Sequence, residues 1–493
     1  LKACRSRPRN ESHPDAALPL LPPPAMAVVP TADNGLRCHV HQRGQDVQTR
    51  AQATDLGVAL SLADSSSSGR SSCCGCLRPG SPRGDPLLPE VLSYQDMLGA
   101  YVDPSTSTVR LVYCPRNRKR SRVRKDVLLK IGGSGSVGSS LAEAEAWAAD
   151  VSQRCFPADY RRRFLVFVNP ASGNGSAPQN WRQVEELWSA LAGIECTVVT
   201  TESANDAQER VKSMDLESCD GIVVVSGDGL VHEVLNGLAA RSDAKRALEL
   251  IPVGHIPGGS GNGLAKSILS ACGESFGVLD MAFLIAKGGR QPITLMKAQV
   301  GDGPLRTSFL SLAAATISDV DLGSESLRCL GGLRFTVWAV WRVIRPLKLR
   351  MRIVYWPVEA PGKPPAEAPP LSAELSGEPW KTIEDDVAIF WGMNVAWGSY
   401  DACPAPGAAL HDGVWHLVVL RGRSITRSAL LSFFLRLETG GQVDLPGVEV
   451  LRCRALRLEP LEEGGFLSLD GEQVPCVPVQ VWPMACDGYV LGR

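Results

Sequence analysis

The sequence lacks any long uncharged apolar run. The longest neutral stretch of interest, residues 387–400, contains glycine and is shorter than the roughly 18 residues that a membrane span needs. The sequence also lacks a large net charge, because its 51 basic and 52 acidic residues nearly cancel to a formal net charge of -1. The sequence therefore excludes an integral membrane protein and disfavours a nucleic-acid binder that works through bulk positive charge, while a peripheral membrane protein stays open.

Paired cysteine motifs are also lacking. The 15 cysteines are scattered, so the sequence favours neither a zinc ribbon nor a disulfide scaffold. Cys73, Cys74 and Cys76 cluster in a Ser/Gly/Arg-rich stretch, which fits either S-palmitoylation or, as the favoured reading, chance cysteines in a disordered tail. The chain begins with Leu1 rather than Met, which indicates a fragment or a translation from upstream of the true start.

The N-terminal third predicts two regions. Residues 1–88 are rich in Pro, Ser, Gly and Arg, and we expect a disordered low-complexity tail. Residues 89–158 predict a small β-rich module, with strands at 108–113 and 126–131, followed by a linker helix at 141–155. Between the strands, residues 116–125 hold seven basic side chains and no acid, which fits a loop on anionic lipid or equally a solvated loop or localisation signal.

The rest of the sequence predicts the fold class α/β plus β, which is an α/β domain followed by a β-rich domain. Residues 159–292 alternate strands and helices, starting with the continuous apolar run 164–168, and predict a doubly wound nucleotide-binding domain. Ligands of such sheets bind beyond the carboxyl ends of the strands. Residues 293–493 predict a β-rich domain, best described as a sandwich, with helices at 333–344 and 428–437. Its insert at 357–379 carries seven prolines and predicts a loop or a disordered segment.

Glycine-rich loops follow strands of the α/β pattern at residues 169–175, 226–229 and 257–262. Glycine lets backbone amides approach a phosphate, and the N-terminus of a following helix adds positive potential. Because the loops follow parallel strands, we expect them to meet at one phosphate or nucleotide site. Neither GxxxxGK[ST] nor a GxGxxG after the first strand is present, so an ordinary P-loop and a Rossmann dinucleotide site are excluded.

Asp228 stands between two glycines directly after a predicted strand. A carboxylate there can accept the proton of an attacking hydroxyl, hold Mg²⁺, or cap the next helix. Glu233, inside the following helix, is a candidate for metal or nucleotide binding or else a solvated charge. His232 is interpreted as a packed or surface histidine.

Residues 226–238, SGDGLVHEVLNGL, resemble the signature of sphingosine kinases, and diacylglycerol and ceramide kinases share the GDG core. The blocks 169–175, 258–262 and 317–322 resemble other parts of the same family, so the resemblance runs from about residue 164 to the C-terminus. Residues 87–131 resemble the N-terminal extension of plant-type members. The resemblance implies a nucleotide-binding domain like those of NAD kinase and diacylglycerol kinase, followed by a lipid-binding β-sandwich.

That resemblance also implies an activity. It is ATP- and Mg²⁺-dependent phosphorylation of the primary hydroxyl of a sphingoid base, which is sphingosine, sphinganine or phytosphingosine, to the 1-phosphate. A cytoplasmic enzyme that associates peripherally with membranes and binds no nucleic acid is expected; the oligomeric state is not predicted. Alternatives are a diacylglycerol or ceramide kinase, an NAD kinase, and a lipid-binding regulator with an inactive kinase domain.

The resemblance assigns site residues by their match to the family blocks, and it assigns no metal ligand. Asp228 is the implied catalytic base. The implied ATP-binding residues are Asn169, Pro170, Ala171, Thr201, Glu202, Ser203, Ala204, Asn205, Glu233, Gly259, Ser260, Gly261, Arg328, Arg334, Asp470, Gly471 and Glu472. The implied substrate-binding residues are Ser226, Gly227, Asp228, Gly229, Asp321 and Ser311.

The chemistry of these residues suits the implied substrates. Asp319 with Asp321 would offer carboxylates to an ammonium head group, or else form a solvated turn, and arginines suit a triphosphate. Asn174 stands where many sphingosine kinases have Lys, and the Ala313–Ala315 run replaces aromatics of relatives, which indicates a differently shaped lipid pocket. Trp338 and Trp341, near basic residues, fit an acyl slot or membrane interface, or ordinary core packing. The turn 411–413 resembles a structural Mg²⁺ site of bacterial relatives.

Overall fold

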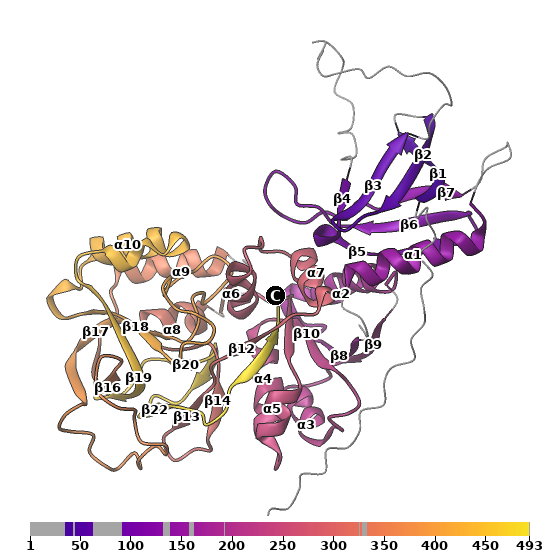
Figure 1. The fold of residues 1–493 in the computed structure, drawn as a ribbon. Helices are drawn as coiled ribbons and strands as arrows, with labels where there is room; N and C mark the ends of the chain where they lie inside the picture. The colour runs from indigo at the N-terminus through magenta and orange to yellow at the C-terminus, as the bar shows by residue number, and fades with distance from the viewer. Residues whose placement is uncertain are drawn as a thin grey trace, which may run out of the picture.

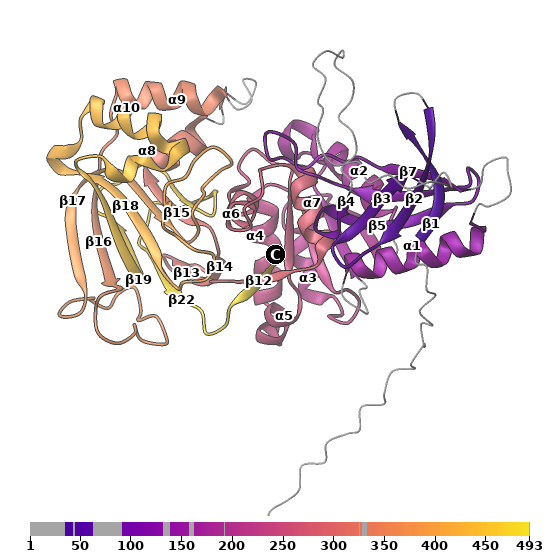
Figure 2. The same cartoon turned by 45° about the horizontal axis from the view of Figure 1, so that its top comes forward.

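The computed structural model describes residues 35–42, 45–62, 91–131, 139–156, 162–191, 193–324, 326–327 and 333–492. These residues form an N-terminal β module, a central α/β domain and a C-terminal β-rich domain, each with its own sheet (Figure 1). The α/β domain lies between the other two parts in both views (Figures 1 and 2). None of the described helices is long and apolar enough to cross a membrane.

The N-terminal module is an antiparallel sheet in the order β4-β3-β2-β1-β7-β6-β5, covered by one helix. Its elements are β1 (Gly35–Gln42), β2 (Gln45–Ala53), β3 (Gly57–Leu62), β4 (Val91–Ser93), β5 (Met97–Asp103), β6 (Thr108–Tyr113), β7 (Val127–Ile131) and α1 (Leu141–Cys155). Helix α1 begins with a capping box between Ser140 and Glu143 and buries Trp147 and Val151 against the sheet. The strands and the helix predicted between 108 and 155 are confirmed.

The prediction of disorder for residues 1–88 is wrong for β1, β2 and β3. In β1, Leu36, Cys38 and Val40 alternate with more exposed residues and are each 2% exposed. This alternation is typical of a half-buried strand. Strand β1 pairs locally with β2, whereas its other neighbour, β7, follows some 90 positions later in the chain, beyond any local pattern. The cysteine cluster at 73–76 lies outside the described residues.

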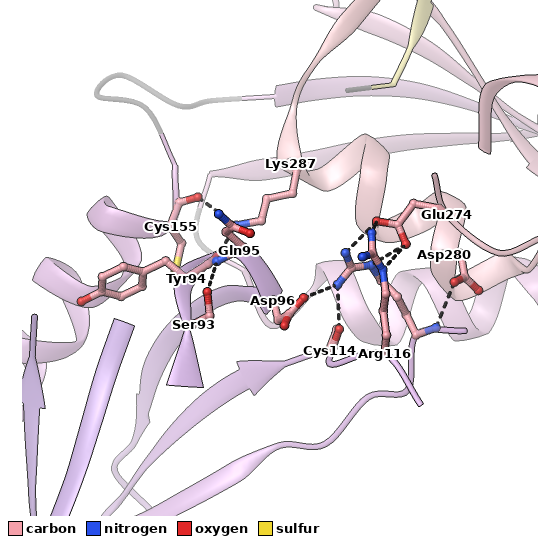
Figure 3. Close-up of polar contacts among 11 residues, drawn as sticks. Ser93, Tyr94, Gln95, Asp96, Cys114, Arg116, Cys155, Glu274, Asp280 and Lys287 are labelled. Carbon is pink, nitrogen blue, oxygen red and sulfur yellow. Dashed lines mark hydrogen bonds and ion pairs between the residues drawn. The ribbon is translucent and has the colours of Figure 1, made fainter. Parts of the chain in front are cut away.

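Ion pairs to one buried carboxylate, Glu274, join the N-terminal module to the α/β domain. Arg116 and Arg122, from the basic run between β6 and β7, both bind the Glu274 carboxylate, with Nη2–Oε1 distances of 2.7 Å (Figure 3). Arg122 also donates to Asp96 and lies over the Phe283 ring, 3.5 Å from its centroid. The hypothesis that this run contacts anionic lipid is therefore wrong for Arg116 and Arg122, because an acid of the neighbouring domain already binds them.

The central sheet has the order β12-β23-β11-β10-β8-β9. Its strands are β8 (Arg162–Val168), β9 (Ile194–Thr200), β10 (Gly221–Ser226), β11 (Val253–Pro257), β12 (Arg290–Ile293) and β23 (Gly488–Leu491). Strands β9, β8, β10, β11 and β23 run parallel in that spatial order, and β12 pairs antiparallel with β23. The predicted boundary at residue 292 therefore needs correction, because the last described strand returns from the C-terminal domain to complete the α/β sheet.

Helices flank this sheet on both sides. They are α2 (Ala177–Trp188), α3 (Asp206–Ser213), α4 (Asp228–Ala239), α5 (Ala244–Leu250), α6 (Gly263–Ala271) and α7 (Val278–Lys287). Helix α2 packs against α7, while α4 packs against α3 and α5, and both α2 and α4 contact β10. The doubly wound architecture is confirmed. Helix α5 ends at Leu250, and β11 begins at Val253.

The C-terminal domain is an antiparallel sheet that folds over a core of its own. Its strands are β13 (Met296–Val300), β14 (Arg306–Ser308), β15 (Ser311–Ala315), β16 (Leu349–Pro357), β17 (Lys381–Met393), β18 (Trp415–Arg421), β19 (Val448–Pro460), β20 (Leu467–Leu469), β21 (Glu472–Val474) and β22 (Val479–Pro483). Both β16 and β18 pair with β17 and with β19, so the sheet curls around buried side chains such as Trp415, Leu417 and Phe390. The predicted β-rich domain is confirmed.

Helical segments α8 (Thr316–Ser318), α9 (Leu333–Ile344) and α10 (Arg427–Arg436) cover one end of this domain (Figure 1). Helix α9 has the predicted bounds, and α10 is shifted by one residue. The proline-rich insert is a loop that follows the outer surface of the sheet. The buried Arg457 donates to the carbonyls of Pro370 and Ala373, and Trp482 Nε1 donates to Pro365.

Candidate active site

The three glycine-rich loops meet at the carboxyl ends of β8, β10 and β11. The Gly258 amide donates to the Ser226 carbonyl at 2.8 Å, and Ser226 Oγ donates to Ser172 Oγ at 3.1 Å. A Cβ on Gly259 would overlap the Cα of Gly227, so this contact requires glycine. The structure thus brings together the loops that sequence reasoning expected at one site.

Asn262 holds the third loop in shape. Its Oδ1 accepts the amides of Gly258 and Gly259 at 3.2 and 3.0 Å, and its Nδ2 donates back to the Gly259 carbonyl. The residue has a φ of 63°, which asparagine tolerates better than most residues. Ser260 and Gly261 follow Gly259 in this turn and are half-buried or exposed at the surface of the site.

The first loop and the segment after β9 flank these turns. Asn169 Oδ1 accepts the Ala171 amide at 3.0 Å, which fixes the turn through Pro170. Thr201 is buried and donates its amide to the Val168 carbonyl. The next predicted nucleotide residues, Glu202, Ser203, Ala204 and Asn205, are all exposed.

Asp228 is the first residue of α4 and is 7% exposed. Its Oδ2 accepts the Gly263 amide at 2.7 Å, and its Oδ1 accepts the Leu264 amide at 3.0 Å. These amides begin α6, so the carboxylate caps a helix from across the site rather than its own helix. The two bonds fix the carboxylate firmly between α4 and α6.

Glu233 and Glu472 are two further carboxylates of the site. Burial raises the pKa of Glu233, the amides of Asn205 and Ala207 lower it, and Glu472 raises it further. Glu233 Oε2 is buried without a hydrogen-bond partner. Glu472 is exposed and packs on Gly229, with its Oε1 2.8 Å from the position that a Cβ there would take. The turn that carries Gly471 and Glu472 therefore lies over the loop that carries Asp228.

The Asp470 side chain does not face the nucleotide loops as an open ligand. It is 1% exposed, and its carboxylate accepts the Ser308 hydroxyl and the amides of Leu310 and Ser311 at 2.8–2.9 Å. His232 Nδ1 lies 2.9 Å from its Oδ2. Protein donors surround this carboxylate, which joins α4 to the C-terminal domain, and ATP binding at residue 470 stays a prediction.

The acidic pair at 319 and 321 is divided in the structure. Asp319 is 3% exposed, and its carboxylate accepts Trp338 Nε1 at 2.6 Å and Arg342 Nη2 at 2.7 Å. The expectation that Asp319 meets an ammonium head group is wrong, because the Arg342 guanidinium already neutralises this carboxylate and Trp338 Nε1 donates to it. Asp321 lies two residues further on in a π-helical turn and is half-buried. The predicted substrate residue Ser311 is buried on β15.

The two predicted phosphate-binding arginines have different outcomes. Arg328 lies outside the described residues. Arg334 lies in the first turn of α9, where its guanidinium is 4.4 Å from the centroid of the Phe335 ring. Its Nη1 is buried without a partner, so a contact with ATP stays a prediction.

Three residues of the site were missed or undervalued by sequence reasoning. His255 lies inside β11 with Nδ1 3.7 Å from Asp228 Oδ1. Asn236 joins α4 to β14, because its Nδ2 donates to the Thr307 carbonyl and its Oδ1 accepts the Thr307 amide. His232 is one turn before Asn236 and Asp228 one turn before His232, so a spacing of four already placed all three on one face of α4.

Comparison with known proteins defines the class. The family model of the diacylglycerol kinase catalytic domain matches residues 163–298, and that of the YegS C-terminal NAD kinase beta sandwich-like domain matches residues 400–487. A solved structure assigned as a diacylglycerol kinase, from Bacillus anthracis str. Sterne, shares the fold with a TM-score of 0.50 and 18% identity, over 68% of this chain and 97% of that one. The α/β and β-sandwich pair is therefore that of a lipid kinase with a diacylglycerol kinase-type catalytic domain.

Curated relatives define the family within that class. Sphingosine kinase 1 of Homo sapiens is 35% identical over 339 residues, which cover 64% of this chain and 88% of that protein. Sphingosine kinase 2 of Arabidopsis thaliana is 31% identical over 360 residues, which cover 67% of this chain and 73% of that protein. The chain belongs to the sphingosine kinase family.

Proposed function

We propose that this lipid kinase transfers the γ-phosphoryl group of ATP to the primary hydroxyl of a sphingoid base and releases the 1-phosphate. Sphingosine, sphinganine and phytosphingosine are the proposed acceptors. The observation that carries the proposal is the meeting of three glycine-rich turns around Asp228, at the boundary between the α/β domain and the C-terminal domain. The curated relatives are named for sphingosine, which supports this choice of lipid.

The triphosphate would lie over the amides of the three turns. We assign it to residues Asn169–Ala171 and Gly259–Gly261, with the exposed segment 201–205 and the turn at Gly471 and Glu472 around the nucleotide. Backbone amides next to a helix N-terminus favour anions without a long cationic side chain, which suits a first loop that has no lysine. Arg334, and Arg328 outside the described residues, would add charge at the phosphates.

Asp228 is the proposed general base. The lipid hydroxyl attacks the γ-phosphorus as its proton passes to the Asp228 carboxylate, and the bond to the β-phosphate oxygen breaks to release ADP. The two amides of α6 hold the carboxylate in one orientation, so little reorganisation is needed during the reaction. Most of the rate enhancement would then come from positioning and charge neutralisation.

Mg²⁺ fits the site as a partner of the triphosphate. Within the described residues, no cluster of three or more His, Cys, Asp or Glu side chains could hold a metal ion by itself. Mg²⁺ in kinase sites commonly relies on one or two carboxylates, with water and substrate phosphates supplying the other ligands. The buried, unpartnered Oε2 of Glu233 suits that role. When bound, the ion would neutralise charge on the phosphates.

The acyl chain would enter the apolar cluster beneath α9 and α10. Its buried members Ile317, Leu430 and Phe433 pack between the helices and strands β15, β17 and β18. Ile317 of this cluster directly precedes, in the sequence, the segment Ser318–Gly323 that carries Asp321. A lipid bound in the cluster would therefore bring its amine toward the Asp321 carboxylate. We therefore retain Asp321, with Ser311, as the proposed contacts of the head group.

The outer face of α9 is proposed to rest on an anionic membrane. Leu333, Val337, Val340 and Ile344 are 48–67% exposed and follow one another at helical spacing. Exposed basic side chains lie just after α9 (Arg345 and Lys348), just before α10 (Arg423) and on α10 (Arg427 and Arg436). Sedimentation with vesicles that contain anionic lipid, compared with neutral vesicles, tests this face; equal binding to both, or none, would refute the electrostatic part of the proposal.

The decisive assay uses labelled ATP with five lipids side by side: the three sphingoid bases, diacylglycerol and ceramide. We expect phosphorylation of the sphingoid bases, and loss of at least about a hundredfold in kcat for Asp228→Asn with the fold retained. Phosphorylation of only the neutral lipids would favour the diacylglycerol or ceramide alternative. No phosphorylation of any lipid would favour the inactive regulator, and an active Asp228→Asn variant would refute the base assignment.

Asp321→Ala separates the lipid classes in the same assay. A sphingoid base carries an ammonium group that gains from a nearby carboxylate, whereas diacylglycerol carries none. We expect a raised KM for sphingoid bases and an unchanged KM for ATP. Equal losses with charged and neutral lipids would contradict the assigned contact.

A further inference from the structure

A histidine is buried directly beneath the proposed base. His255 is the third residue of β11, pairs in register with Val224 of β10, and is 0% exposed. Its Nε2 lies 3.0 Å from the Ser226 carbonyl oxygen. Since a carbonyl oxygen only accepts hydrogen bonds, Nε2 must carry the proton and donate it.

The other ring nitrogen faces the carboxylate of Asp228. His255 Nδ1 has no hydrogen-bond partner and lies 3.7 Å from Asp228 Oδ1. Burial lowers the pKa of His255, and the Asp228 carboxylate opposes this only in part. The ring is therefore neutral at physiological pH, and a nitrogen lone pair faces a carboxylate oxygen. That arrangement has no hydrogen bond while Asp228 is ionised, and gains one when Asp228 is protonated.

Asp228 is the charged group that faces this ring. The other titratable side chains on the elements packed against β11 have partners elsewhere or are exposed. On α4, His232 pairs with Asp470, and Glu233 faces the backbone amides of Asn205 and Ala207 at the start of α3. On α6 and α7, Lys266 lies over the Trp397 ring, Asp280 accepts the Arg122 amide, and Lys287 donates to the carbonyls of Tyr94 and Cys155. On β23, Tyr489 lies under Arg290, and the α2 side chains Arg182, Glu185 and Glu186 are exposed.

We propose that His255 is a positioning residue for the base, whose Nδ1 accepts a hydrogen bond from the Asp228 carboxyl once that group has taken the proton of the lipid hydroxyl. This inference rests on the proposed role of Asp228. The O–H bond of the lipid breaks, its oxygen bonds to the γ-phosphorus, ADP leaves, and the proton on Asp228 points to His255. Catalytic hydrogen bonds often tighten only in the reacting complex, so a 3.7 Å separation beforehand is consistent with this role.

His255 offers the protonated Asp228 carboxyl a hydrogen-bond acceptor that the two amides of α6 do not supply. Amides that donate to a carboxylate stabilise its ionised form and weaken it as a base. An acceptor that bonds only to the protonated form has the opposite effect. His255 thus complements the amides of α6, because these bind the ionised carboxylate whereas Nδ1 can bond only to the protonated carboxyl.

His255→Gln tests the proposal. The glutamine amide can still donate to the Ser226 carbonyl, but it replaces the Nδ1 acceptor beside Asp228 by an amide oxygen, which is a far weaker base than an imidazole nitrogen. We expect kcat to fall about tenfold with little change in either KM, because a weaker base accepts the proton less readily. The acid limb of the kcat–pH profile should move to lower pH by about one pH unit, because the protonated carboxyl loses its partner. A purely structural residue would raise KM or lower stability and leave that limb in place.

His416→Gln is the matched control. His416 is also buried on a strand, its Nε2 also lacks a partner, and it lies 3.8 Å from Asp412 Oδ2, in the sheet of the C-terminal domain. The acid limb should not move in this variant. Equal shifts in both variants, or a wild-type profile and kcat in His255→Gln, would overturn the proposal.

Two further measurements separate this inference from the proposed function. In an Asp228→Asn background, His255→Gln should add no further loss of kcat, whereas a full additional tenfold loss would show that His255 acts independently of Asp228. Nitrogen-15 spectra of the chain without substrate should show His255 neutral with the proton on Nε2 at pH 7. A doubly protonated ring would refute the inference even if the kinase assignment holds, and the expected tautomer can be found even if the chain phosphorylates no sphingoid base.

Discussion

The α/β domain meets its two neighbours through interfaces of different chemistry. Toward the N-terminal module, Arg116 and Arg122 share Glu274, and Lys287 donates to the carbonyls of Tyr94 and Cys155 (Figure 3). Toward the C-terminal domain, hydrogen bonds with backbone groups predominate. They involve Asn236 with Thr307, Tyr400 with Gly261, and Trp397 with Ser267.

The two interfaces differ in their distance from the proposed active site. The charged interface lies on the side of the α/β domain away from the C-terminal domain, whereas the hydrogen-bonded interface is formed by the same helix and loops that carry Asp228, Gly261 and Glu472 (Figure 2). A buried ion pair fixes two surfaces in one arrangement, since separating the charges leaves each without a partner. We infer that the N-terminal module is fixed rigidly, while the boundary that receives substrates is held by many weaker bonds.

Arg122→Met should have the largest effect on stability. The Arg122 and Glu274 side chains are 3% and 2% exposed, and loss of one partner of a buried pair costs about 3–5 kcal/mol. Arg116 still binds Glu274, so we expect about 3 kcal/mol, measured as a lower urea midpoint for the transition that includes the N-terminal module. Arg118→Met, an exposed arginine of the same loop, is the control and should leave the midpoint unchanged. Equal midpoints for both variants would contradict the comparison.

The same interface should weaken in acid. Burial alone would raise the pKa of Glu274, but hydrogen bonds from Arg116 and Arg122 outweigh it and hold the pKa below the ordinary value of 4.5. A group whose pKa is lowered by folding stabilises the fold above its unfolded value, and this contribution is lost as pH falls through the folded value. Wild-type stability should thus decline below about pH 4.5, more steeply than that of Arg122→Met, in urea titrations at several pH values.

Asp470→Asn should have an intermediate effect that acts on the other interface. The carboxylate accepts bonds from one hydroxyl and from backbone amides, and an asparagine places an NH₂ group against some of these donors. Loss of hydrogen bonds to a buried charge costs about 2 kcal/mol. Because Asp470 also bonds His232 of the helix that begins with Asp228, kcat should fall as well.

Asp487→Asn controls for the charge change at Asp470. Asp487 also pairs with a histidine, His411, at 2.9 Å, but both side chains are about half exposed. We expect neither the urea midpoint nor kcat to change in this variant. If Asp470→Asn lowered stability and left kcat intact, the hydrogen-bonded interface would be structural only, and its proposed link to the site would fail.

The sequence predicts the local parts of this molecule better than its long-range bonds. The apolar runs of β8 and β10 and the loops after them carry their own signal, so the α/β fold and the position of Asp228 could be predicted. The partners of Asp319 lie 19 and 23 positions away in the chain, and those of Asp470 lie 159–238 positions away. Nothing local shows that these carboxylates are already bound by protein groups. For His255, a single histidine in an apolar strand is typical of a core position and gives no sign of its neighbour.

The smallest effect is expected where ion pairs resemble those of Arg122 but lie in solvent. Arg352, on β16, binds Glu384 at 3.0 Å and Glu459 at 3.2 Å, while its own side chain is 43% exposed. Water and salt screen such pairs, and ordering the long side chains offsets most of the attraction. Arg352→Met should therefore leave the urea midpoint unchanged at physiological ionic strength and shift it only slightly at low salt. A loss as large as that of Arg122→Met would show that the number of carboxylate partners, rather than their burial, determines the strength of the interface to the N-terminal module.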